Sequence, residues 1–304
     1  MKKLLCLLLC LTALLSCSAA QAELMRHSMT ETALTLLPEG DPFIRRYNQM
    51  TGAKVEASFT LGVPYFFGGQ KGWQVFQNWP DYTRCPAWQD SRYYRKGTFY
   101  LCGFDCRGFL GWVRQENGQS MVPKLRQMLS DTRLYGQYYL FTSSAKFDLP
   151  ITDYAEVRQT VRPGDLLVIA HGGTHVMMYI GTMRDFGYTA EDVPKLAEYL
   201  DYPLMIHCGD SPVAGDRFQP YIDQAGQLFS TTVTTDGCVQ VSILGVPREL
   251  ADVHANVNNE DFYYFYIDDG SIMTIYSLDD KDAWTFLRLP DHPTGEGKRI
   301  EGSN

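Results

Sequence analysis

The sequence predicts an α+β fold in which helices from the first half of the chain pack on an antiparallel β-sheet from the second half. Two observations support this fold class. Residues 106–113 place apolar side chains at helical spacing, and residues 121–133 have a second helical pattern. After residue 237 the pattern changes to short β-rich segments separated by turns. Helices and strands in separate parts of a chain are typical of the α+β class.

The N-terminal half is expected to begin with a helical arm and a glycine-rich loop. Residues 23–55 contain two short helices, and Asp41 followed by Pro42 favours the start of the second. Residues 62–69 form a loop dense in Gly and Pro. Residues 70–101 are rich in Trp, Tyr, Pro and Arg without a clear period, so we interpret them as a long ordered loop.

The second half is expected to supply the sheet. Residues 166–170 and 175–180 form two strands joined by a tight turn. Residues 189–200 have the apolar spacing of a helix, and a short strand is expected at 203–207. Further strands are expected at 239–244, 262–267, 271–276 and 284–289.

Composition and charge exclude several classes of protein. The 304 residues are 45% hydrophobic and 20% charged, which excludes a disordered tail, a collagen-like fibre and a multi-span membrane protein. The length allows one large domain or two small ones. The formal charge of -8 becomes -10 without residues 1–22, because that segment carries two Lys and no acid. Such an acidic chain repels phosphate backbones, which argues against a nucleic acid partner.

Residues 1–22 have the three-part pattern of a secretory signal peptide. A basic start is followed by an apolar run that is too short to span a bilayer, and small residues precede Glu23. We therefore expect export to the periplasm or the extracellular space. Two alternatives remain open. One is an uncleaved N-terminal membrane anchor, and the other is a lipid anchor on Cys17, because residues 14–17 resemble a bacterial lipoprotein box.

Five cysteines remain when the expected signal peptide is removed. Export places them where disulfides persist, and an odd number leaves one thiol unpaired. Four of them could form two bridges while the fifth serves as a nucleophile, and the sequence alone does not choose the pairs. These cysteines are Cys85, Cys102, Cys106, Cys208 and Cys238.

Cys106 lies at an expected helix start, where unpaired backbone N–H groups and the helix dipole favour a thiolate. A thiolate attacks a carbonyl carbon, and a neighbouring imidazole lowers its pKa and later protonates the leaving amine. His175 begins a strand after a tight turn and can supply this imidazole. His207 ends the next strand and can supply a third polar group that holds the imidazole in the required tautomer.

Each of these residues also has a structural interpretation. A single Cys is most often a core residue or half of a disulfide, and Cys102 is near enough in sequence to Cys106 for a local bridge. A single His is most often a surface or core residue. A zinc site is a further alternative, although the Cys-x-x-Cys pairs of strong zinc sites are absent. Its ligands would come from Cys102, Cys106, His171, His175, His207 and Cys208.

Three sequence blocks together carry a resemblance to a known family. The first is Gly-Val-Pro-Tyr-Phe-Phe-Gly-Gly at 62–69, and the second is Phe-Asp-Cys-Arg-Gly-Phe at 104–109. The third is Arg-Pro-Gly-Asp-Leu-Leu at 162–167, followed by His-Val-Met-Met-Tyr-Ile-Gly at 175–181. In order and spacing these blocks resemble the NlpC-type family of bacterial cell-wall cysteine peptidases, which have a papain-like fold. The resemblance covers roughly residues 56–210.

The resemblance implies a reaction and a set of site residues. Family members hydrolyse amide bonds in peptidoglycan stem peptides, typically between D-γ-glutamyl and a diamino acid. By motif position, Cys106 is the nucleophile, His175 the base and His207 the third member of a Cys-His-His triad. Tyr65 lies beside the nucleophile and assists substrate or oxyanion binding, and Asp105 faces the free amine of a trimmed stem peptide. From the residues alone, Tyr65 could equally be a core residue and Asp105 a helix cap.

Arg107 departs from the family pattern, because Ser usually follows the nucleophile. A planar guanidinium is suited to binding carboxylates, so we expect Arg107 to change the substrate preference. The alternative is that it points to solvent from the first helical turn. The loop at 70–101 and an insertion at 182–205 can also reshape the cleft.

The sequence therefore predicts an exported cysteine peptidase that acts on stem peptides or muropeptides through a thioester. The expected organisation is a signal peptide at 1–22, a helical arm at 23–55 and a papain-like domain at 56–304, with a β-rich extension from about residue 231. No cofactor, metal, nucleic acid or membrane span is expected. Alternatives on the same fold are an N-acetylmuramoyl-L-alanine amidase and an acyltransferase. A non-catalytic cell-wall-binding protein is the alternative from another class.

Overall fold

The computed structural model describes most of the chain between residues 27 and 289. The expected signal peptide, the lipoprotein alternative at Cys17 and the turn residue His171 lie outside the described residues. The described residues are 27–69, 84–86, 97–119, 125–128, 138–143, 150–170, 174–211, 213–230, 232–255, 261–276, 278 and 283–289.

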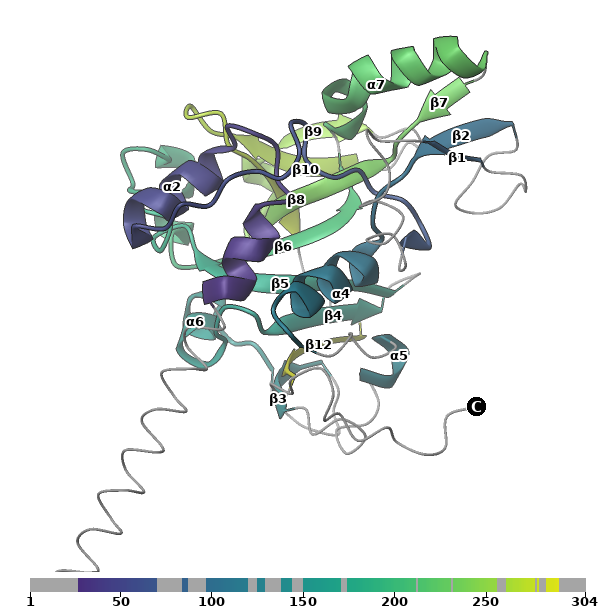
Figure 1. The fold of residues 1–304 in the computed structure, drawn as a ribbon. Coiled ribbons are helices and arrows are strands. Elements are labelled where there is room, and N and C mark those ends of the chain that lie inside the picture. Colours follow the sequence, from purple (N-terminus) through teal and green to yellow (C-terminus); the bar gives the residue numbers. More distant parts are fainter. Residues whose placement is uncertain are drawn as a thin grey trace, which may run out of the picture.

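A nine-stranded sheet forms the centre of the molecule, with the strand order β3-β12-β4-β5-β6-β8-β11-β10-β9 (Figure 1). Its helices and mixed sheet confirm the α+β class. The sheet was expected to be antiparallel, and this is wrong at one strand pair, because β8 and β11 run parallel. Its strands are β3 (Tyr138–Thr142), β4 (Leu166–Ala170), β5 (Thr174–Thr182), β6 (Pro203–Asp210), β8 (Gly237–Leu244), β9 (Asp252–Ala255), β10 (Asp261–Tyr266), β11 (Ile272–Tyr276) and β12 (Ala283–Arg288).

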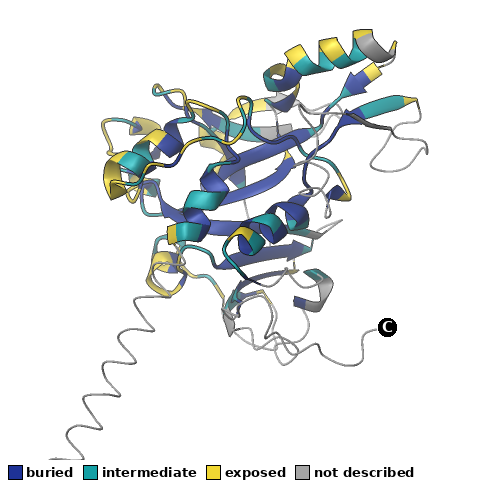
Figure 2. Cartoon of the chain, viewed as in Figure 1, coloured by how far each residue is buried: buried dark blue, intermediate teal, exposed yellow. Residues whose placement is uncertain are grey.

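Apolar side chains cover both faces of the central strands. One face joins a large core that includes Val176, Ile206 and Val241, and the other joins a smaller core that includes Met177 and Met205. Figure 2 shows these strands as the most buried part of the molecule. Strands that are buried on both faces read as continuous apolar runs rather than as alternating patterns. This explains why the run at 166–170 predicts a strand without any alternation.

The N-terminal helices contribute to the larger core. Residues 27–34 are helical, and α2 spans Pro42–Thr51. The Asp41 carboxylate accepts the N–H of Phe43 and caps α2, as the sequence predicts. Helix α4 (Cys106–Glu116) packs on β5 and β6. The remaining short helices are α5 (Leu125–Met128), η2 (Tyr154–Glu156), α6 (Val157–Thr160), η3 (Pro194–Tyr199) and η4 (Arg248–Leu250).

Two expected elements differ from the structure. The helix expected at 189–200 is only a 3₁₀ helix, η3, which starts at Pro194. A proline disfavours the α conformation of the residue before it, and Val193 is indeed non-helical. The segment 70–101 was interpreted as a loop, yet its described parts form two strands, β1 (Arg84–Pro86) and β2 (Thr98–Leu101), which pair antiparallel.

A second, three-stranded sheet lies beside the main one at the end where α7 is drawn (Figure 1). It consists of β1, β2 and β7 (Thr232–Thr234), and helix α7 (Ala214–Phe229) contacts β7. Helix α7 and β7 lie in the chain between β6 and β8, and β2 ends five residues before Cys106. The small sheet is therefore connected directly to the segments that carry the expected site residues.

Candidate active site

Cys106 is the first residue of α4, and the local sequence explains why the helix begins there. Asp105 is extended, and its carboxylate accepts the N–H of Gly108 at 2.6 Å. The Asp105 carbonyl oxygen accepts the N–H of Phe109, which starts the helical ladder. Asp105 therefore acts as the helix cap that the sequence predicts, and this fixes the thiol at the end of α4 nearest the sheet.

The Cys106 side chain is 8% exposed, and it lies against the start of β5. The backbone N–H of Val176, the residue after His175, donates to the sulfur and lowers the pKa of the thiol, as does the N–H of Arg107. Burial is the largest effect and acts in the opposite direction. Together with the Asp105 carboxylate, it raises the pKa of Cys106 to about 12.

The N–H groups at the helix start therefore favour the thiolate, as the sequence predicts, but burial outweighs them. A buried thiol loses the hydration that would stabilise its anion, and the N–H groups at the helix start do not compensate for this loss. The carboxylate of Asp105 repels a second negative charge nearby. Cys106 is a neutral thiol at neutral pH and needs a base that removes its proton.

His175 and His207 form a hydrogen-bonded pair. Nε2 of His175 lies 2.9 Å from Nδ1 of His207, and the two rings meet edge to face. Burial lowers the pKa of His175 to about 4. Burial, followed by the charge of His175, lowers the pKa of His207 as well. Both imidazoles are neutral at neutral pH, so His175 can accept a proton from a thiol.

The strand arrangement creates the space for this pair. β5 pairs with β6 between Met178 and Thr182, whereas β6 continues along β8 as far as Asp210. The two rings lie against Gly209. A β-carbon at Gly209 would approach Cε1 of His175 to 3.0 Å and Nδ1 of His207 to 3.2 Å. A side chain at this position of β6 would therefore have to displace the imidazoles by a few tenths of an ångström.

Two residues that the sequence does not single out complete the surroundings of the histidines. The Ser242 hydroxyl lies 2.7 Å from Nε2 of His207, and the Tyr276 ring stacks on His175 at a centroid distance of 6.2 Å. They belong to β8 and β11, so only the sheet register brings them to the histidines. The one local signal is that two polar residues, Gln240 and Ser242, alternate with apolar residues in a buried strand.

Tyr65 lies close to the thiol. Its N–H donates to the carbonyl of Gly237 at 2.7 Å, and it forms a β-bridge with Phe104. Burial raises the pKa of Tyr65, and the charges of Cys106 and then Asp210 raise it further. Arg107 lies in the first turn of α4 and is partly exposed.

The possibility of two disulfides that the sequence left open does not hold in the structure, because Cys208 and Cys238 are both thiols. Cys208 pairs with Val239 across β6 and β8, and Cys238 pairs with Gly209. Side chains on neighbouring positions of a strand point to opposite faces, so the two thiols lie on opposite sides of the sheet. The side chain of Cys85 lies outside the described residues. Within the described part of the chain, no group of three potential ligands is placed to hold a metal ion.

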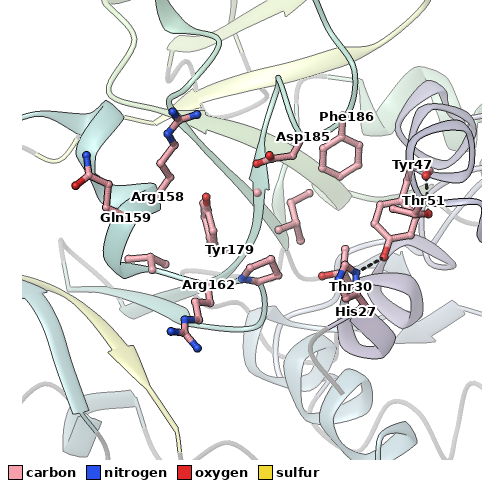
Figure 3. Close-up of a pocket in the computed structure, with 14 residues that line it drawn as sticks. His27, Thr30, Tyr47, Thr51, Arg158, Gln159, Arg162, Tyr179, Asp185 and Phe186 are labelled. Carbon is pink, nitrogen blue, oxygen red and sulfur yellow. Dashed lines mark hydrogen bonds between the residues drawn. The ribbon is translucent and has the colours of Figure 1, made fainter. Parts of the chain in front are cut away.

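A separate pocket of about 440 Å³ opens at the opposite end of β5 (Figure 3). Tyr179, Asp185 and Phe186 line it together with Tyr47 of α2 and Arg158 of α6. None of the triad residues contributes to its wall. The candidate site at the Cys106 end of β5 and this pocket are therefore separate features of the molecule.

Comparison with known proteins identifies one family. Residues 62–193 match the model of the NlpC/P60 family. No curated protein and no solved structure matches the chain. Within the described residues, no helix has both the length and the apolar character needed to cross a membrane. The matched segment contains Tyr65, Cys106 and His175, whereas His207, Ser242 and Tyr276 follow it in the chain.

Proposed function

We propose, on the premise that residues 62–193 belong to the NlpC/P60 family, that this protein is a cysteine peptidase that cuts peptidoglycan stem peptides. The bond is the amide between D-γ-glutamyl and a diamino acid. One observation carries the proposal more than any other. The thiol of Cys106 lies at a helix start and accepts the N–H of Val176, the residue that follows His175 in β5. Nε2 of His175 in turn lies 2.9 Å from Nδ1 of His207.

The reaction begins from a neutral thiol and a neutral imidazole. Because Nε2 of His175 is engaged by His207, Nδ1 is the ring nitrogen available to take the proton from Cys106. The resulting thiolate attacks the amide carbon, and the imidazolium gives its proton to the leaving amine. Water then attacks the thioester with His175 again acting as base, which releases the acid and restores the thiol.

The oxyanion formed in both steps needs donors that are already in place. The backbone N–H of Cys106 at the start of α4 is such a donor, because helix-start N–H groups have no partner within the helix. Tyr65, close to the sulfur, supplies a hydroxyl for the substrate or the oxyanion. Asp105 accepts the free amine of a trimmed stem peptide while it caps α4. Arg107 pairs with a substrate carboxylate.

The proposed function includes export and a domain organisation. Residues 1–22 act as a signal peptide, which delivers the enzyme to the periplasm or cell exterior, either free or lipid-anchored at Cys17. Residues 23–55 form an arm that packs on a papain-like domain at 56–304. The chemistry requires no cofactor, because thiol and imidazole supply both the nucleophile and the proton transfers.

Digestion of purified muropeptides tests the proposal. Mass spectrometry should find a product whose new amino terminus is the diamino acid. Cys106→Ala should lower turnover more than about a thousandfold with an unchanged circular dichroism spectrum. Cys238→Ala is the matched control, because it removes a different buried thiol, which belongs to β8. This variant should remain active.

Other outcomes of this digestion identify other functions. Stem peptides freed from the sugar would indicate an amidase, and new cross-linked or acylated products would indicate an acyltransferase. Sacculus binding without any product would indicate a non-catalytic wall-binding protein. Full cleavage by Cys106→Ala would remove the thiol from the mechanism.

A further inference from the structure

We propose that Ser242 is a positioning residue that fixes the tautomer of His207 and, through it, the proton-accepting nitrogen of His175. The expected effect of Ser242 on kcat rests on the proposed peptidase function. Its structural part concerns a hydrogen-bonded chain from His175 to Thr274, which stands on the geometry alone. The chain lies beyond the segment that matches the family.

The four residues form one continuous chain of side-chain hydrogen bonds. Nε2 of His175 lies 2.9 Å from Nδ1 of His207, and Nε2 of His207 lies 2.7 Å from the Ser242 hydroxyl oxygen. The Ser242 hydroxyl in turn bonds the Thr274 hydroxyl. The chain crosses four neighbouring strands of the sheet, β5, β6, β8 and β11.

The sheet register places these residues on one face. Ser242 is the strand partner of Met205 on β6 and of Thr274 on β11. His207 is two residues along from Met205, so it points to the same face, on a diagonal from Ser242. A one-residue shift of β8 would turn Ser242 to the opposite face of the sheet.

The reaction allows only one arrangement of protons along this chain. A His175 that takes the thiol proton on Nδ1 must carry its own proton on Nε2. Nδ1 of His207 must then accept that Nε2–H, so the proton of His207 is on its own Nε2. The Ser242 oxygen accepts this proton, and the Ser242 hydroxyl is free to donate to Thr274.

Burial makes the arrangement selective. His207 is 3% exposed, Ser242 0% and Thr274 6%, so solvent has little access to the chain. Without the Ser242 oxygen, the Nε2–H of His207 would be buried without an acceptor. The tautomer with the proton on Nδ1 would then compete, and it presents a donor to Nε2 of His175. His175 would have to hold its proton on Nδ1, where it can no longer accept one from Cys106.

Ser242→Ala tests the kinetic consequence. We expect kcat for muropeptide cleavage to fall about ten- to a hundredfold with KM unchanged, because only the active protonation state is depleted. Ser242→Thr keeps a hydroxyl and should restore most of kcat. Thr285→Val is the matched control, because Thr285 is a buried hydroxyl of the same sheet that bonds Thr142 instead of a histidine. It should leave kcat unchanged.

The nitrogen-15 shifts of labelled histidines test the tautomer directly and do not depend on activity. His207 should carry its proton on Nε2 in the parent protein and in Thr285→Val, and it should become a mixture of tautomers in Ser242→Ala. Thr274→Val, which leaves the Ser242 oxygen in place, should keep the parent tautomer. Ser242→Cys, whose sulfur is only a weak acceptor, should shift the tautomer in the same direction as Ser242→Ala, and it serves as the second variant if Ser242→Ala does not fold.

The outcomes separate the two proposals. A His207 with its proton on Nδ1 in the parent protein, or an unchanged tautomer in Ser242→Ala, overturns the positioning role. A loss of kcat in Ser242→Ala without a change of tautomer also overturns it. If Cys106→Ala still cleaves muropeptides, the peptidase mechanism fails, while the spectra still decide the role of Ser242.

Discussion

At the scale of single residues, the neutral state of the Cys106 and His175 side chains determines how the site responds to pH. In the active form, Cys106 is a protonated thiol and His175 is a neutral imidazole that can accept its proton. This form is lost when His175 gains a proton, near pH 4, or when Cys106 loses one, near pH 12. We therefore expect kcat/KM to rise between about pH 3 and 5 and then to stay level across the neutral range. A fall below pH 9 would contradict the neutral pair.

The carboxylate of Asp105 gives a second test at this scale. It raises the pKa of Cys106, so Asp105→Asn should lower that pKa and increase the thiolate fraction at pH 8 by about three- to tenfold. Asn keeps the helix cap. The measurement is the rate of iodoacetamide labelling of Cys106, read by peptide mass spectrometry. Asp41→Asn, the same change at the cap of α2, should leave the rate unchanged.

The local environment of a residue also decides which site residues the sequence can predict. Cys106 and Asp105 follow from a helix start, and His175 from a strand start, because both patterns lie within a few neighbouring positions. Ser242 and Tyr276 reach the histidines only through pairing of strands far apart in the chain. No local pattern contains that register, so these residues require the structure.

At the scale of elements, the cap of α2 links stability to pH. Burial raises the pKa of Asp41 to about 6 from its ordinary value of 3.8, so the folded protein favours the protonated acid. This preference stabilises the folded protein. The stabilisation is fully present below pH 3.8 and is lost as the pH rises through about 6. At pH 7 the charged carboxylate is therefore a cost to the folded state.

Asp41→Asn should remove this cost and keep the cap. A pKa shift of two units would correspond to about 3 kcal/mol of stability. Because Asp41 is partly exposed, we expect Asp41→Asn to raise the free energy of unfolding by about 1–2 kcal/mol at pH 7. At pH 3.5 we expect no gain. Urea unfolding at both pH values measures it. Asp153→Asn, at the exposed cap of η2, is the control. An equal gain at both pH values would show that titration is not the cause.

Element predictions fail where propensity and structure disagree. Helix α7 spans sixteen residues, yet it contains Gly215, Pro220 and Gly226, which disfavour a helix interior. Contacts with the small sheet compensate for that poor propensity, since Phe218 packs with Leu101 and Val233. The continuous apolar run of β4, by contrast, predicts a buried strand directly from the sequence.

At the scale of the whole molecule, the segment that matches the family model is not a complete folding unit. It ends at residue 193, before β6, β8, β11, β10, β9 and β12. β5 would then lose its hydrogen-bonded neighbour β6, and the larger core would lose Leu204, Ile206 and Val241. The α+β class is predictable from the order of helices and strands, but this dependence on the C-terminal strands is not, because it follows from long-range pairing.

We therefore expect a chain that ends at residue 193 to be unable to fold, whereas a chain that ends at Leu289 folds and retains activity. The first exposes the edge of β5 and removes the apolar residues that β6 contributes beside α4, while the second keeps all the described helices and strands. Thermal unfolding followed by circular dichroism measures both. A cooperative transition in the shorter chain would show that the residues up to 193 fold without the C-terminal strands. In that case, adding residues 194–289 as a separate chain should restore cleavage only if His207 docks beside His175.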